Sequence, residues 1–154
     1  MLDALTNSSL SEALRAHGWV WPTLEIFHLC GMILLFGSLL IFDLRVLGYA
    51  PQFPIAATTQ LLKYALIGFC MNLISGGLLV LGAVHHFLSN PAFLLKMTLI
   101  IAAGLNACFF HVFIHNGAVN NINSRAARIS AICSLVLWAS IITLARFIAY
   151  IESI

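Results

Sequence analysis

Residues 22–44 of the chain read PTLEIFHLCGMILLFGSLLIFDL. The acidic and basic side chains of this run are Glu25, His28 and Asp43, and the rest is almost entirely apolar. An α-helix needs roughly 20 consecutive apolar residues to cross the hydrocarbon core of a bilayer. The run therefore predicts a transmembrane helix that carries ionisable groups near both of its ends.

Three more apolar runs follow, at residues 64–88, 92–115 and 129–151. The whole chain is 62% hydrophobic and 8% charged, whereas soluble domains carry roughly a quarter charged residues. None of the runs alternates in polarity as the strands of a barrel do. We therefore predict an all-α integral membrane protein, a four-helix bundle with short loops that forms a single domain over residues 1–154.

Two local motifs refine this prediction. Residues 10–19 read LSEALRAHGW, which is typical of a short N-terminal interfacial helix, with Trp19 at headgroup depth. Between the second and third runs, Asn90 is suited to cap a helix and Pro91 to its first position. We therefore expect a tight hairpin between the second and third membrane helices.

The basic residues of the loops predict the orientation of the chain. Arg45 and Lys63 flank the loop after the first run, and Arg125 and Arg128 lie in the loop after the third. The flanks on the opposite side contain Arg15. Because cytoplasmic loops carry an excess of Lys and Arg, we expect a bacterial inner-membrane protein with both termini in the periplasm.

Ionisable groups from all four predicted helices fall in one outer layer, if each residue adds about 1.5 Å of rise. They are Glu25, His28, His86, Lys96 and Arg146. On the second helix, Gly76 and Ala83 form a lane of small residues that leads to His86. Small residues on a membrane helix allow close backbone approach, or they leave room for a flat cofactor.

Two histidines on neighbouring membrane helices favour axial ligation of a b-type haem, and hence electron transfer within the membrane. In this hypothesis His28 and His86 are the ligands. Lys96 or Arg146 neutralises the propionates, and a quinone or a periplasmic redox partner exchanges electrons with the protein. Whether the chain is an enzyme is left open.

Three alternatives stay open for the same groups. Glu25 pairs with Lys96 or Arg146 in the structural core of a non-enzymatic membrane subunit. Glu25 and His28 titrate in a transporter-like protein that handles protons or solutes. Glu25, His28 and His86 hold a single transition metal in place of haem.

A second polar cluster is expected in the cytoplasmic half. Its members are Asp43, Arg45, Asn106, His111 and His115. His111 lies about 30 Å along the third helix from Pro91, which is too deep to meet His28. We interpret this cluster as a clamp at the inner surface, with Asp43 bonded to His111 or to the arginines.

Other functions are excluded by missing motifs. The sequence has no nucleophile elbow and no phosphate-binding loop. Its seven Lys and Arg residues are spread along the chain without a basic face, which argues against nucleic-acid binding. The expected surroundings are the lipid bilayer, with a homo-oligomer or a larger membrane complex left open.

Four segments resemble a group of uncharacterised bacterial four-helix membrane proteins. They are WPTLEIFHLCGMILLFGSLLIFDLRVLG (21–48), SNPAFLLKM (89–97), GLNACFFH (104–111) and SLVLWASIITLARFIAY (134–150). The chain also resembles, distantly, the membrane domain of copper-resistance D-type proteins and, in architecture, small b-type cytochromes. The motif positions that the resemblance implies are Glu25, His28, Asp43, Arg45, Asn90, Lys96, Asn106, His111, Trp138 and Arg146. His85 and His86 are not among them.

Overall fold

The computed structural model describes residues 9–115, 122 and 124–148 of the chain. Within these residues every regular element is helical, which confirms the predicted all-α class. In chain order the elements are α2 (Ser9–Ala16), α3 (Val20–Leu47), α4 (Ile55–Gly82), α5 (Val84–Ser89), α6 (Pro91–Phe109), a π-helical turn η1 (Phe110–His115) and α7 (Arg125–Phe147).

Four of these helices are long and apolar enough to cross a membrane, as predicted. The candidate spans are Val20–Leu47, Ala56–Gly82, Pro91–Phe113 and Arg125–Phe147, with 28, 27, 23 and 23 residues. Each exceeds the roughly 20 residues that a transmembrane helix needs. The chain is therefore a multi-pass membrane protein, and the first span is longer at both ends than the predicted 22–44.

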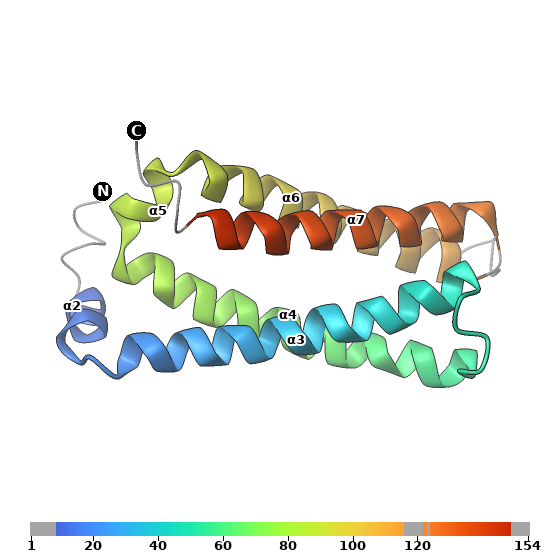
Figure 1. Cartoon of the computed structure of the whole chain (residues 1–154), viewed down its shortest axis with the longest axis horizontal. Coiled ribbons are helices and arrows are strands. Elements are labelled where there is room, and N and C mark those ends of the chain that lie inside the picture. The colour runs from blue at the N-terminus through green and yellow to red at the C-terminus, as the bar shows by residue number, and fades with distance from the viewer. Residues whose placement is uncertain (1–8, 116–121, 123, 149–154) are drawn as a thin grey trace.

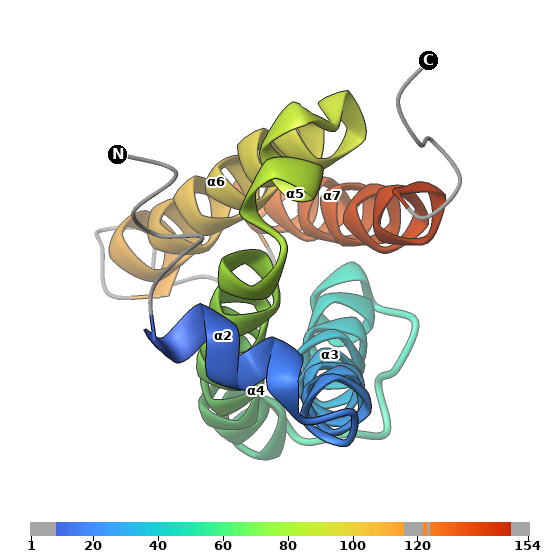
Figure 2. The ribbon, with the colours of Figure 1, turned by 90° about the vertical axis from the view of Figure 1, so that its left-hand side faces the viewer.

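The bundle consists of two helical hairpins that lie side by side. Helices α3 and α4 form the lower pair in Figure 1, and α6 and α7 form the upper pair. The end view in Figure 2 shows α2 lying across the ends of α3 and α4. Helix α3 packs against both α4 and α7, whereas α4 and α6 make no close backbone approach within the described residues.

Glycines bring the backbones of α3 and α4 into direct contact. A Cβ atom on Gly68 would lie 2.6 Å from both the Gly31 carbonyl oxygen and the Leu35 backbone nitrogen. A Cβ atom on Gly31 would lie 2.9 Å from the Asn72 side chain. Small residues permit such close packing of membrane helices. The small-residue lane of α4 is therefore, at this level, the surface on which α3 lies.

The apolar run predicted that the second span continues to residue 88, but the helix ends earlier. Helix α4 ends at Gly82, and Ala83 has a non-helical backbone (φ −144°, ψ 52°) before the short helix α5 begins at Val84. At the same point the indole of Trp21 lies over Gly82, with Cζ3 2.6 Å from where a Cβ atom would be. The chain therefore turns where α3 covers the end of α4, and His86 lies beyond the turn.

The predicted cap of the third span is confirmed. The Asn90 side chain accepts hydrogen bonds from the backbone nitrogens of Ala92 (2.9 Å) and Phe93 (3.4 Å), and Pro91 is the first residue of α6. Asn90 Nδ2 also donates to the carbonyl of Ile148 at 3.2 Å. The cap thus ties the start of α6 to the end of α7.

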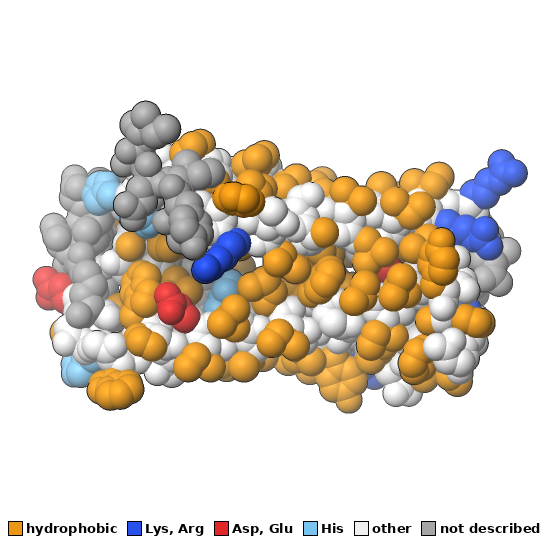
Figure 3. Space-filling model, in the orientation of Figure 1, with side chains coloured by type: hydrophobic (Ala, Val, Ile, Leu, Met, Phe, Trp, Pro, Cys, Tyr) orange, Lys and Arg blue, Asp and Glu red, His pale blue; other side chains and the backbone are white. Residues whose placement is uncertain are grey.

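The short N-terminal helix is present as α2, and its location at a membrane interface stays a prediction. Ser11 is fully buried, and its hydroxyl donates to the Leu81 carbonyl at 3.0 Å. On the face shown in Figure 3, hydrophobic side chains cover the flanks of the bundle. Most of the acidic and basic side chains seen there lie toward the two ends. This distribution is compatible with contact with the lipid bilayer.

Candidate functional site

His28 of α3 reaches across to α4. Its Nδ1 atom lies 2.9 Å from the hydroxyl oxygen of Ser75, which is fully buried. The Ser75 hydroxyl also lies 2.6 Å from the Met71 carbonyl oxygen, one turn back along α4. A serine hydroxyl has a single proton to donate, and the Met71 carbonyl can only accept. Ser75 therefore accepts from the Nδ1–H group of His28, and the neutral imidazole carries its lone pair on Nε2.

The imidazole ring fits against a glycine. A Cβ atom on Gly76 would lie 3.2 Å from Cε1 and 3.6 Å from Nδ1 of His28. The Nε2 atom of His28 lies more than 4 Å from the position of this Cβ atom. One edge of the ring is thus fixed against α4, and its Nε2 corner points away from that contact.

Glu25 lies one turn before His28 on α3. Its carboxylate accepts a hydrogen bond from Nε1 of Trp21 at 3.0 Å, and the side chain is exposed. Glu25 is thus bonded to a tryptophan on its own helix, and a pairing with Lys96 or Arg146 stays a prediction. The expected partners, Lys96 and Arg146, belong to α6 and α7.

Lys96 brings a positive charge from α6 into the same half of the bundle. Its Nζ atom lies 5.5 Å from the centre of the Phe93 ring, which is within the range of a cation–π contact. Arg146 lies in the last turn of α7 and is exposed. We call this half, with His28 and Lys96, the outer half.

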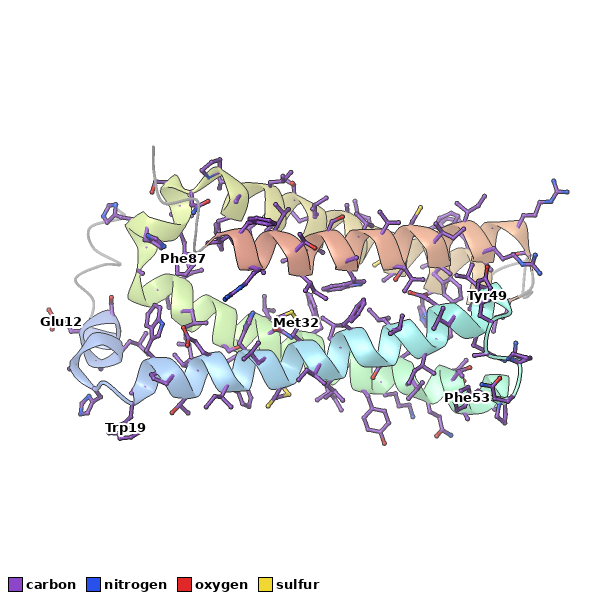
Figure 4. The ribbon with its side chains drawn as sticks, viewed as in Figure 1. Glu12, Trp19, Met32, Tyr49, Phe53 and Phe87 are labelled. Atoms are coloured by element: carbon purple, nitrogen blue, oxygen red, sulfur yellow. The ribbon has the colours of Figure 1, made fainter. Side chains whose placement is uncertain are left out.

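Figure 3 shows acidic, basic and histidine side chains close together near the end of the bundle that carries α2. In Figure 4, Trp19 and Phe87 lie at this end, and Tyr49 and Phe53 lie at the other. Met32 lies farther along α3 and lines an apolar groove of about 210 Å³. The groove is formed by Leu29, Met32, Ile33 and Phe36 of α3 with Ile142 of α7.

His86 lies beyond the end of α4, on a different helix from Ser75 and Gly76. His86 is an exposed residue of α5, and its ring packs edge-on against Phe87 at 5.3 Å. Gly76 is level with His28, and the remainder of α4 up to Gly82 adds about 9 Å of rise before the chain turns.

Side chains of α3 pack against two glycines of α4, and one of these glycines belongs to the lane of small residues that was expected to admit a porphyrin edge. The His28 imidazole occupies the space beside Gly76, and the Trp21 indole occupies the space beside Gly82. At these two glycines the absence of a side chain serves helix packing, and the binding of a porphyrin stays a prediction. A metal on Glu25, His28 and His86 is also not supported. Across the described residues, no group of three or more His, Cys, Asp or Glu side chains is placed to hold a metal ion.

The predicted inner cluster is divided into separate contacts. Asp43 is buried, with 4% of its surface exposed, and its carboxyl group is hydrogen-bonded by Ser134 of α7. Arg45 donates from Nε to the Phe53 carbonyl at 2.7 Å. His111 is exposed on η1, and the side chain of His115 lies outside the described residues. The expected bond between Asp43 and Arg45 or His111 is thus replaced by one to a serine.

Asn106 forms a reciprocal pair with Ser130. Its Nδ2 donates to the Ser130 carbonyl, and its Oδ1 accepts from the Ser130 hydroxyl, both at 3.0 Å. Ser130 and Ser134 lie four residues apart on α7, so they share one helical face. This spacing is the signal by which the sequence could have predicted that the α7 face carrying them points into the bundle.

Comparison with known proteins places the chain at the level of the family. The family of unknown function DUF6644 matches residues 4–151. The chain belongs to this family. No curated protein and no solved structure matches it. The DUF6644 match confirms the resemblance to an uncharacterised family, whereas likeness to copper-resistance D-type proteins or to cytochromes is not shown.

Proposed function

We propose that this DUF6644 protein is a proton-handling membrane protein, in which His28 takes up and releases a proton in the outer half of the bundle. The observation that supports this function is the hydrogen bond from His28 Nδ1 to Ser75, with Ser75 in turn bonded to Met71. Ionisable residues inside membrane helices are costly and usually belong to functional sites. A histidine is the side chain whose charge changes near neutral pH.

The arrangement suits both charge states of the imidazole. The neutral ring accepts a proton at Nε2, while Nδ1–H stays bonded to Ser75. The protonated ring has N–H groups at both nitrogens, so the contact with Ser75 is unchanged. His28 can therefore gain and lose a proton without breaking the α3–α4 contact that holds it.

The neighbours of His28 support a route to the aqueous surface. Glu25 is exposed one turn nearer the end of α3, where its carboxylate can exchange protons with water. Lys96 of α6 lies in the same half of the bundle, with its Nζ atom 5.5 Å from the centre of the Phe93 ring. We propose that this surface is periplasmic, because Arg45 in the last turn of α3 and Arg125 and Arg128 at the start of α7 lie at the opposite end.

Haem binding with electron transfer is the second candidate. A histidine that donates from Nδ1 leaves Nε2 available to a metal, and such bonds commonly orient metal ligands. The available Nε2 atom of His28 is the feature that favours haem. A quinone or a periplasmic redox partner would then exchange electrons with the haem. The filled space beside Gly76 and the position of His86 on α5 argue against the pair of ligands first expected. Proton handling needs no second ligand and is therefore preferred.

Proton flux into liposomes tests the proposal. The purified protein is reconstituted with a pH-sensitive dye inside, and a potassium diffusion potential is applied with valinomycin. We expect faster acidification than in protein-free liposomes, with the difference lost in His28→Gln. His86→Gln is the matched control, since His86 is exposed on α5, and it should behave as the unmodified protein.

Two results would overturn the proposal. One is a flux equal to that of protein-free liposomes, and the other is an unchanged flux in His28→Gln. A haem Soret band in protein expressed with haem supplied, lost in His28→Ala, would favour the second candidate instead.

A further inference from the structure

Asp43 carries a polar atom with no partner, deep inside the bundle. The side chain is 4% exposed, and its Oδ2 atom has no hydrogen-bond partner among the described residues. Among the residues that the structure describes, the side chain hydrogen-bonded to this carboxyl group is that of Ser134 on α7. Buried carboxylate oxygens are almost always paired, so an orphaned one calls for a ligand.

The basic groups of this inner half are engaged elsewhere or face outward. On α3 itself, Arg45 donates to the Phe53 carbonyl. On the elements packed around it, the basic side chains are exposed: Lys63 on α4, Arg125 and Arg128 on α7, and His111 on η1. Asp43 therefore has no cationic side chain to balance a negative charge, as far as the structure describes the chain.

An ionised carboxylate is unfavourable in these surroundings. Phe42, Val46 and Ala131 form an apolar cluster beside Asp43 on α3 and Ser134 on α7. Burying an unpaired charge costs far more than burying a neutral acid. The missing positive charge must therefore come from a small ligand, either a proton or a metal cation.

The oxygen atoms nearby favour the proton. Metal cations such as Mg²⁺ and Ca²⁺ need several oxygen ligands. The Asn106 side chain and the Ser130 hydroxyl are already bonded to each other. No metal-binding group of His, Cys, Asp or Glu is found in the described part of the chain. A single proton on the carboxyl group satisfies the site without further ligands.

We infer that Asp43 is a second proton-binding site, in the inner half of the bundle, whose carboxyl group holds its proton at neutral pH and releases it reversibly in alkaline solution. This second site goes beyond the proposed function, because Asp43 lies about 22 Å along α3 from His28 and contacts none of the residues around His28. It rests on the orphaned oxygen of Asp43 alone. The flux experiment can therefore disprove the role of His28 while the inference on Asp43 holds. Equally, the inference on Asp43 can fail while the role of His28 holds.

Infrared spectroscopy of the full chain in liposomes tests the inference. A protonated carboxyl group has a carbonyl stretch that is well separated from the bands of an ionised carboxylate. We expect this band at neutral pH in the unmodified protein and in Glu25→Gln, and we expect its loss in Asp43→Asn. On raising the pH the band should disappear, and on returning to neutral pH it should reappear.

Three results would overturn the inference. Unmodified protein and Asp43→Asn could have the same spectrum at neutral pH, which would mean that Asp43 is ionised. The band could persist at every pH at which the protein stays helical by circular dichroism, which would make Asp43 a permanent acid. Finally, replacing potassium by sodium at constant pH could abolish the band, which would identify a metal cation as the ligand.

Ser134→Ala is the control variant, because it keeps the carboxyl group of Asp43. It should retain the band, which would show that a nearby substitution alone does not remove it.

Discussion

The Ser75 hydroxyl oxygen of α4 lies 2.9 Å from Nδ1 of His28 on α3, and the hydroxyl donates a hydrogen bond to the Met71 carbonyl at 2.6 Å. This contact joins the two helices at a point where both are within the membrane span. It also decides which nitrogen of the imidazole is free.

Removing the Ser75 hydroxyl should destabilise the protein. In Ser75→Ala the Nδ1–H group of His28 loses its acceptor, and an unsatisfied polar group in a buried contact costs about 1–3 kcal/mol. Denaturant unfolding in detergent, followed by circular dichroism, measures the change. Ser89→Ala is the control, because Ser89 is exposed and bonds a carbonyl of its own helix. Equal stability of the two variants would contradict the prediction.

Gly68 should not tolerate a methyl group. In Gly68→Ala the new Cβ atom would lie 2.6 Å from backbone atoms of Gly31 and Leu35, so α3 and α4 would have to separate. Overpacking of this kind costs about 1–3 kcal/mol. Gly77→Ala, on the same helix with nothing within 4 Å, should leave stability unchanged or raise it slightly. Similar melting temperatures for the two variants would show that the helices are not in contact there.

Asn90 should be needed for two separate contacts. Asn90→Ala removes both the cap of α6 and the bond to the Ile148 carbonyl, and the loss of a cap alone costs about 1 kcal/mol. Asn90→Asp keeps the acceptor for the cap and loses the donor to Ile148, so its stability should fall between those of Asn90→Ala and the unmodified protein. If Asn90→Asp proves as unstable as Asn90→Ala, the cap contributes nothing measurable.

The orientation can be tested with reporters fused to the C-terminus. Because Arg45, Lys63, Arg125 and Arg128 lie at one end of the bundle, we expect a reporter that is active only in the periplasm to work there. A reporter that is active only in the cytoplasm should give no signal. The opposite pattern would reverse the inner and outer sides of the molecule.

The fold could be predicted because each membrane span is encoded locally. Runs such as 22–44 and 129–151 are apolar over the length of a helix, and that pattern requires no knowledge of their neighbours. The break at Ala83 could not be predicted in the same way. It occurs inside an apolar run, where Trp21 from a different helix packs against Gly82.

The site could be predicted in part. The positions of His28 and Lys96 along their helices predicted that both lie in the outer half, and in the structure they lie near the first turns of α3 and α6. The partner of His28 depends on how α3 and α4 are aligned, so the sequence alone did not identify Ser75. The same holds for Asp43, whose partner Ser134 lies on a helix whose inward face the sequence did not decide.

The central claim is that His28 accepts a proton at Nε2 while Nδ1 stays bonded to Ser75. Nitrogen-15 NMR of protein labelled at histidine tests it most directly, with His28→Gln used to assign the signals. The account predicts a neutral His28 with Nδ1 protonated, which becomes doubly protonated as the pH is lowered. A neutral ring with the proton on Nε2, or a His28 signal that does not change over the pH range in which the protein stays folded, would contradict it.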